Sequence, residues 1–114
     1  MSKKPDGALC RLDDIPDGDA KGFEIDQGGE SVDILVVRRG ETVYGYVNDC
    51  PHLGTPLSWV EDDFMTFDRE FILCSTHGAE FRVEDGYCTA GPCLGDKLQP
   101  VPVAVADGWV VRRG

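Results

Sequence analysis

The chain has 114 residues, which predicts a single domain over residues 1–114. Its 21 acidic and 11 basic residues give a net charge of −10, which argues against nucleic acid or an anionic membrane as partner. The charge favours docking on a basic protein surface, with simple solubility as an equal alternative. No apolar run reaches the roughly 18 residues that a membrane helix needs, and none follows the two N-terminal lysines as in a secretory signal. We therefore expect a cytoplasmic protein.

Short β-rich runs separated by glycine, proline and aspartate dominate the chain, and helical periodicity is weak. The predicted strands cover residues 8–12, 22–25, 32–37, 42–47, 71–73, 81–83, 87–89, 101–106 and 109–111. Three pairs of these strands are expected to form hairpins, and two of the turns contain the Asp-Gly pairs Asp85-Gly86 and Asp107-Gly108. Such pairs supply the positive backbone angles of tight turns. The pattern predicts an all-β fold, a compact sandwich or barrel.

Two short boxes each pair one cysteine with one histidine. Residues 50–54 read Cys-Pro-His-Leu-Gly, and residues 74–78 read Cys-Ser-Thr-His-Gly. Each box follows a predicted strand, and the chain's two histidines both fall within the boxes. The candidate metal ligands are Cys50, His52, Cys74 and His77. Two thiolates and two imidazoles suit either a structural zinc site or an iron–sulfur cluster, so the ligand count alone leaves both open.

The residues around the two boxes resemble the signature of Rieske proteins, C-x-H-x-G and C-x-x-H-G-x-x-F. The similarity extends over about residues 8–112 and includes Gly91-Pro92 and Leu98, where the family has a proline loop that covers the cluster. The resemblance implies a Rieske-type antiparallel β-sandwich with a small cluster-binding subdomain made of two strand-end loops. It also implies one [2Fe–2S] cluster per chain, with the inner iron on Cys50 and Cys74 and the outer iron on His52 and His77.

The resemblance also indicates a low-potential member of the family. High-potential Rieske proteins of respiratory complexes carry an additional, disulfide-bonded cysteine in each box and a serine hydroxyl against a bridging sulfide. This sequence has Thr55, Thr76 and Ala79 at those positions. Hydrogen bonds to the sulfurs stabilise the reduced cluster, which is the more negative state. A cluster with fewer such donors is therefore harder to reduce and has a lower potential.

By this resemblance we expect a monomeric one-electron carrier that docks transiently between a flavin-dependent reductase and a terminal, ring-hydroxylating oxygenase. Both histidines are committed to the cluster, so the ligands of a mononuclear-iron oxygenase site are missing and we expect no catalysis on this chain. Two alternatives remain open: a small Rieske-like subunit of a larger redox enzyme, such as an assimilatory nitrite reductase, and a zinc-stabilised binding module.

An unusually long segment of 21 residues separates His52 from Cys74. We interpret residues 59–70 as an extended hairpin or flap that leads into strand 71–73. The aromatic residues Trp59, Phe64 and Phe67 are expected to be in the core rather than on a contact surface. The cysteines outside the boxes are expected to be ordinary buried side chains, with a Cys88–Cys93 disulfide as the alternative; they are Cys10, Cys88 and Cys93.

Overall fold

The structure is a computed structural model, and it describes residues 7–49, 64–74, 78–91 and 95–113. The secondary structure of these residues consists of strands and one short 3-10 turn, which confirms the all-β prediction. The strands are β1 (Ala8–Arg11), β2 (Ala20–Gln27), β3 (Glu30–Arg39), β4 (Thr42–Val47), β5 (Phe71–Leu73), β6 (Glu80–Arg82), β7 (Cys88–Ala90), β8 (Pro100–Val101), β9 (Val103–Ala106) and β10 (Trp109–Arg112); the 3-10 turn is η1 (Leu12–Asp14). No helix among the described residues is long and apolar enough to cross a membrane.

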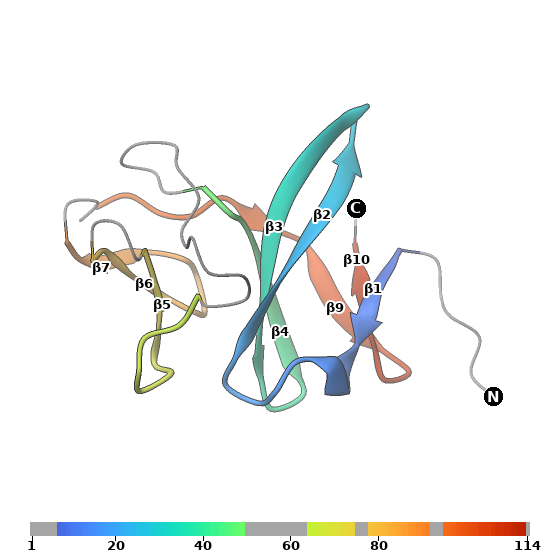
Figure 1. Ribbon diagram of the computed structural model, residues 1–114, viewed down its shortest axis with the longest axis horizontal. Coiled ribbons are helices and arrows are strands. Elements are labelled where there is room, and N and C mark those ends of the chain that lie inside the picture. The colour runs from blue at the N-terminus through green and yellow to red at the C-terminus, as the bar shows by residue number, and fades with distance from the viewer. Residues whose placement is uncertain (1–6, 50–63, 75–77, 92–94, 114) are drawn as a thin grey trace.

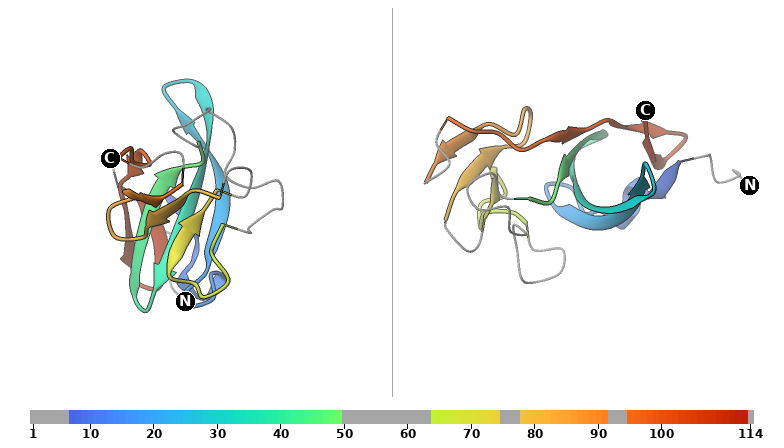
Figure 2. Two further views of the ribbon diagram at one scale, coloured as in Figure 1. Left: turned by 90° about the vertical axis from the view of Figure 1, so that its left-hand side faces the viewer. Right: turned by 90° about the horizontal axis from the view of Figure 1, so that it is seen from above.

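The strands form three antiparallel sheets. Their strand orders are β2-β3-β4-β8, β1-β10-β9 and β5-β6-β7. The first two sheets lie together at the end of the molecule that carries β1 and β10, and the small β5-β6-β7 sheet lies at the other end (Figure 1). Seen from above, β2 to β4 curve around toward β9 and β10, which gives the larger part a partly closed, barrel-like form (Figure 2).

Strand β3 lies between two hydrophobic cores. Its residues Ile34, Leu35, Val36 and Val37 are all fully buried, because both faces of the strand are covered. Ile34 and Val36 belong to the core between the two larger sheets, whereas Leu35 and Val37 belong to the core shared with the small sheet. The small sheet is therefore attached to the larger part through an apolar interface along β3.

One strand prediction was wrong, because the predicted strand 101–106 is two strands in different sheets. Strand β8 pairs with β4, and β9 pairs with β10, with Pro102 between them. Proline has no amide hydrogen and cannot donate to a strand ladder, so the chain changes sheets at this residue. The carbonyl of Pro102 accepts a hydrogen bond from the Arg113 amide at 2.8 Å.

The predicted flap is in part a short hairpin over residues 64–73. Met65 and Ile72 form an antiparallel bridge, and the Leu73 amide donates to the Phe64 carbonyl at 2.8 Å. Phe64 is 4% exposed, which confirms its predicted place in the core. The prediction for Phe67 was wrong: it lies in the turn of the hairpin and is fully exposed, so the turn carries its side chain away from both cores. Trp59 lies outside the described residues.

The predictions for two of the additional cysteines are confirmed. Cys10 is 9% exposed in the core between the larger sheets, and Cys88 is 1% exposed in the core next to the small sheet. The Cys88 thiol donates to the Ala90 carbonyl at 3.2 Å. Cys93 lies outside the described residues, so a Cys88–Cys93 disulfide stays untested.

The thiol of Cys10 makes folding stability sensitive to alkaline pH. Burial, with the nearby carboxylate of Asp14 adding to it and Lys21 opposing it, raises the pKa of Cys10 from 9.0 to about 11. Between these pH values the unfolded thiol loses its proton while the folded one keeps it, so the free energy of unfolding falls as the pH rises. We expect the wild type to lose about 2 kcal/mol more than Cys10→Ala between pH 8 and pH 11.

Urea denaturation of both proteins at the two pH values measures this difference, and the comparison cancels the alkaline sensitivity of all other groups. Equal losses in the two proteins would show that the Cys10 thiol does not titrate abnormally.

Candidate functional site

The structure describes one of the four predicted ligands. Cys74 lies directly after β5 and is fully buried. Cys50, His52 and His77 lie outside the described residues, so the structure does not test whether the four ligands come together. What it shows is the framework that places Cys74 and both ends of the second box.

Two backbone hydrogen bonds tie the second box together. The Cys74 amide donates to the Ala79 carbonyl at 2.8 Å, and the Gly78 amide donates to the Cys74 carbonyl, also at 2.8 Å. The ladder continues directly below, where Leu73 of β5 pairs with Glu80 of β6. Gly78 has a φ of +70°, a conformation that glycine adopts without strain. Strands β5 and β6 thus hold the two ends of the box at a fixed separation.

The chain that leaves β7 packs directly on the second box. Gly91 has a φ of +94°, and a Cβ atom built on it would lie 2.7 Å from the Cα atom of Ala79 and 3.1 Å from its nitrogen. Only a residue without a side chain allows this approach. Ala79 is fully buried beneath it. Gly91 was part of the sequence signature, and the structure supplies the physical reason for a glycine at this position.

Tyr46 of β4 is a buried residue that the sequence analysis did not single out. It is 3% exposed, and its hydroxyl donates to the Val83 carbonyl at 2.5 Å. Its ring lies against Gly86, where an added Cβ would come within 2.7 Å of the ring. The Gly86 carbonyl in turn accepts the amide of the buried Leu98 at 2.8 Å. Tyr46 therefore links the larger part of the molecule to the turn between β6 and β7.

The Tyr46 hydroxyl stays protonated over the working pH range of a protein. Burial is the main cause that raises its pKa, and the negative charges of Asp85 and Glu84 add to it. A neutral hydroxyl keeps its proton for the Val83 carbonyl, so this hydrogen bond does not vary with pH. The sequence around Tyr46 does not predict this hydrogen bond, because the acceptor is 37 residues away.

The surroundings of the Cys74 thiol are apolar. The buried residues of the core that contains it are Ala20, Leu35, Val37, Tyr46, Phe64, Met65, Ile72, Cys74, Ala79, Phe81, Val83, Cys88 and Leu98. A low-dielectric setting of this kind favours a neutral or charge-compensated metal centre over an isolated thiolate.

The described residues supply one predicted ligand of a metal centre, Cys74, and not the full set. Within the described ranges, no group of three or more His, Cys, Asp or Glu side chains is placed to hold a metal ion. Cys74 supplies a sulfur ligand of the kind that iron–sulfur clusters and zinc both accept. The other three predicted ligands stand in the sequence within residues 50–63 and 75–77, which lie outside the described residues.

Comparison with known proteins favours an iron–sulfur cluster over zinc. The family model described as the Rieske [2Fe-2S] domain matches residues 7–105. The ferredoxin of carbazole 1,9a-dioxygenase from Nocardioides aromaticivorans IC177 is 26% identical, with 92% of this chain and 93% of that chain covered and a TM-score of 0.70. A ferredoxin complex of carbazole 1,9a-dioxygenase, with reduced oxygenase and oxidized ferredoxin, contains a chain that is also 26% identical, with 94% and 91% covered and a TM-score of 0.71.

A curated relative points to the same family. The cytochrome b6-f complex iron-sulfur subunit of Chlorobaculum thiosulfatiphilum is 28% identical over 93 residues, which are 82% of this chain and 42% of that protein. The chain thus spans about two fifths of the length of this relative. Because the Rieske model covers most of the sequence and the β-sheet architecture agrees with that of the ferredoxins, the chain belongs to the Rieske [2Fe–2S] domain family.

Proposed function

We propose that this chain is a cytoplasmic one-electron carrier in which Cys50, His52, Cys74 and His77 hold one [2Fe–2S] cluster, and that residues 1–114 act as a single Rieske unit. The observation that carries the proposal is the place of Cys74, a fully buried thiol at the end of β5 whose box is closed by backbone hydrogen bonds. When bound, such a cluster takes up and releases one electron.

The described residues give the site the properties that fast electron transfer requires. The apolar core around Cys74 keeps water away from the thiolate side of the site. The hydrogen bonds of Cys74 with Ala79 and Gly78 hold the ligand backbone in one geometry, so little rearrangement accompanies a change of charge. Gly91 packs on Ala79 and closes the other side of the box.

We expect a low reduction potential. Ala79, which directly follows the second box, is fully buried and carries no hydroxyl that could donate to a sulfur. Protein-film voltammetry should therefore give a midpoint potential in the lower part of the Rieske range of about −150 to +300 mV. A value above about +200 mV would contradict the proposal that the sulfurs lack donors.

Redox proteins are the proposed partners: a flavin-dependent reductase as donor and a ring-hydroxylating oxygenase as acceptor. The similar ferredoxin of carbazole 1,9a-dioxygenase occurs in a complex with its oxygenase, which supports an acceptor of this class. The net charge of −10 favours transient docking on a basic surface.

The oligomeric state distinguishes a carrier from a permanent subunit. A carrier should sediment as a monomer at micromolar concentration and purify without a companion. Constant co-purification with a large flavin or haem subunit would favour the alternative of a fixed subunit in a larger redox enzyme.

A further inference from the structure

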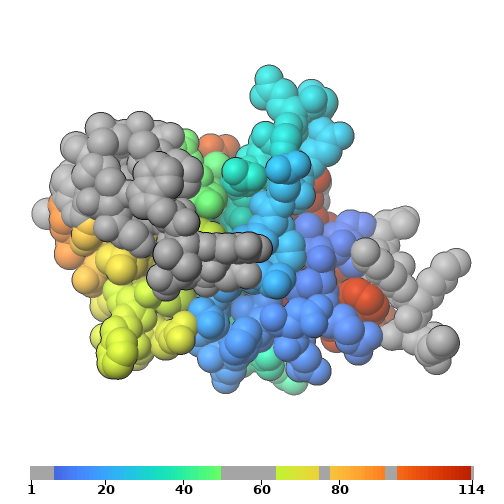
Figure 3. Space-filling model, viewed as in Figure 1, coloured from blue at the N-terminus to red at the C-terminus, as the bar shows by residue number. Residues whose placement is uncertain are grey.

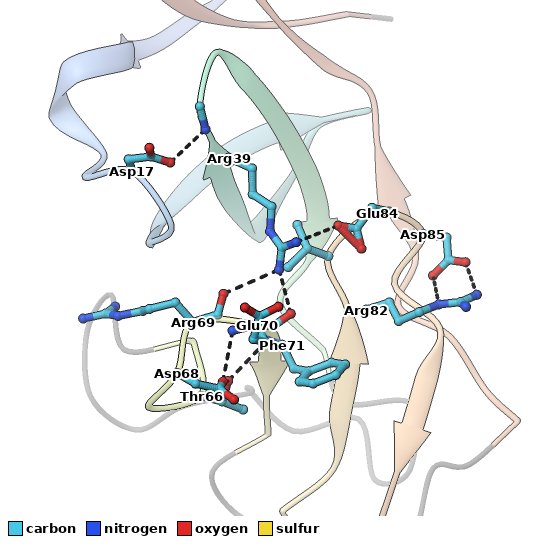
Figure 4. Close-up of polar contacts among 12 residues, drawn as sticks. Asp17, Arg39, Thr66, Asp68, Arg69, Glu70, Phe71, Arg82, Glu84 and Asp85 are labelled. Atoms are coloured by element: carbon cyan, nitrogen blue, oxygen red, sulfur yellow. Dashed lines mark hydrogen bonds and ion pairs between the residues drawn. The ribbon is translucent and has the colours of Figure 1, made fainter.

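Arg39, the last residue of β3, reaches from the larger sheet to the small sheet. One guanidinium nitrogen, Nη2, donates to the Glu70 carbonyl at 2.7 Å and to the Arg69 carbonyl at 3.5 Å. The other, Nη1, contacts the Glu84 carboxylate at 3.0 Å. The two limbs therefore hold two different connections of the small sheet, the turn before β5 and the turn between β6 and β7 (Figure 4).

The turn that Arg39 holds is internally rigid. The Asp68 carboxylate accepts hydrogen bonds from the Thr66 hydroxyl at 2.6 Å and the Glu70 amide at 3.1 Å. The Thr66 hydroxyl oxygen accepts the Phe71 amide at 3.2 Å. These hydrogen bonds, that from Thr66 foremost, lower the pKa of Asp68, so the carboxylate form persists at neutral pH. If the Arg69 and Glu70 carbonyls that Arg39 binds move, Phe71, the first residue of β5, therefore moves with them.

A second polar contact joins the same two parts but is weaker. Arg69 pairs with Asp19 at 2.7 Å, and its side chain is 54% exposed. Exposed ion pairs contribute little because water screens them. The Arg39 side chain is 33% exposed and binds two backbone carbonyls as well as a carboxylate, so it is the stronger of the two links. The turn that these two arginines hold, residues 65–70 (yellow-green), projects at one corner of the molecule (Figure 3).

One buried hydrogen bond also joins the two parts, from the Tyr46 hydroxyl to the Val83 carbonyl at 2.5 Å, and it lies at the turn between β6 and β7 rather than at β5. The other contacts between the two parts that the described residues make in the core are apolar. Leu35 and Val37 of β3 share a core with Ile72 of β5 and Phe81 of β6. Hydrophobic contacts hold surfaces together without fixing their angle, whereas a planar guanidinium fixes both distance and direction. Strand β5 is three residues long and ends at Leu73, directly before Cys74, so its angle decides where the thiol lies.

We propose that Arg39 is a positioning residue for electron transfer: it fixes the small sheet on the larger sheet, and with it the strand that presents Cys74. The inference rests on the proposed function, because its effect on a potential is read at the cluster. Without Arg39 the turn before β5 loses its contacts with Arg39, so β5 moves on the larger sheet although Tyr46 still holds the turn between β6 and β7, and water enters the core around Cys74. Water stabilises the more negative reduced state, so the potential rises.

The neighbouring Arg38 is a matched control. Its Nε donates to the Gly40 carbonyl at 2.7 Å, and its Nη1 donates to the Ile15 carbonyl at 2.9 Å and the Leu12 carbonyl at 3.3 Å. Arg38 therefore makes a comparable number of backbone contacts, all of them within the larger part of the molecule. Its loss should lower stability without moving β5.

The test compares Arg39→Met and Arg38→Met, which keep the aliphatic stem and delete the donors. In the protein as purified, the amides of Leu73 and Cys74, both hydrogen-bonded in the structure, should exchange with deuterium at least about tenfold faster in R39M than its loss in the free energy of unfolding accounts for, and in R38M no faster than its own loss accounts for. In the same samples the equilibrium constant for reduction should rise about threefold in R39M alone, which is about 28 mV for one electron. Arg39→Lys, a single-point donor, should fall between R39M and the wild type and serves in its place if R39M does not fold.

Unchanged exchange at β5 in R39M would overturn the proposal, and so would a potential shift that is equal in R39M and R38M. If the purified protein contains no cluster, the proposed function fails, and the exchange experiment alone tests whether Arg39 positions β5. Faster exchange confined to R39M would support that role, and equal exchange in R39M and R38M would overturn it.

Discussion

Replacing Cys74 with alanine is expected to abolish binding of the iron–sulfur cluster. The variant loses a sulfur ligand at a fully buried position, where no water or neighbouring side chain at the surface can take its place. Iron and acid-labile sulfide should fall from the content of one cluster per chain to background. The visible absorbance of the oxidised protein and the electron paramagnetic resonance signal of the reduced protein should disappear with them.

The matched control is Cys10→Ala. Cys10 is also a buried cysteine, but it lies in the core between the two larger sheets, on the other side of β3. This variant should lose stability by the removal of a buried side chain and keep its full iron and sulfide content. Full cluster content in Cys74→Ala, or equal loss in both variants, would contradict the ligand assignment.

Replacing Gly91 with alanine is expected to destabilise the protein by about 3 kcal/mol or more. Two effects add at this position, since φ is +94° and the new Cβ would lie 2.7 Å from the Cα atom of Ala79. Backbone atoms cannot move aside as a flexible side chain would. Urea denaturation measures the loss in the free energy of unfolding, and the iron content shows whether displacing Ala79 also disturbs the second box.

Gly95→Ala separates the two effects. Gly95 has nearly the same backbone angle, a φ of +97°, but no atom of the described residues lies within 4 Å of the position of an added Cβ. Backbone strain alone should destabilise this variant by about 1 to 2 kcal/mol. Equal destabilisation of the two variants would show that the close contact between Gly91 and Ala79 is not what requires a glycine.

The strands could be predicted from local patterns because each pattern has a local physical cause. The hairpin of β3 and β4 follows from β-branched runs on either side of a polar turn, and the Asp107-Gly108 turn between β9 and β10 from its positive φ angles, +52° and +81°. The division of the strand at Pro102 was missed although proline has a known effect, because the strand pattern on both sides of it is equally strong.

Phe67 was misplaced because a phenylalanine is usually buried, whereas the local turn built by Thr66 and Asp68 carries this side chain outward. Features that depend on distant contacts could not be predicted. Arg39 binds carbonyls 30 and 31 residues away, and carbonyl acceptors leave no trace in a sequence. Tyr46 is similar, since its acceptor is the backbone of Val83.

The candidate site was predictable to the extent that its chemistry is local. Each box contains its cysteine, histidine and glycine within five residues, and the structure places Cys74 of the second box, buried, at the end of the predicted strand 71–73. The meeting of the two boxes is a tertiary contact, so the roles of Cys50, His52 and His77 stay predictions.

The ligand set is tested most directly by electron–nuclear double resonance on the reduced protein labelled with nitrogen-15 in histidine alone. The chain contains two histidines, so each labelled ring reports on one predicted ligand. We predict strong hyperfine couplings from two histidine nitrogens, one from His52 and one from His77. A reduced protein with no histidine coupling, or a colourless protein that contains zinc and gives no paramagnetic signal, would contradict the Rieske cluster proposed here.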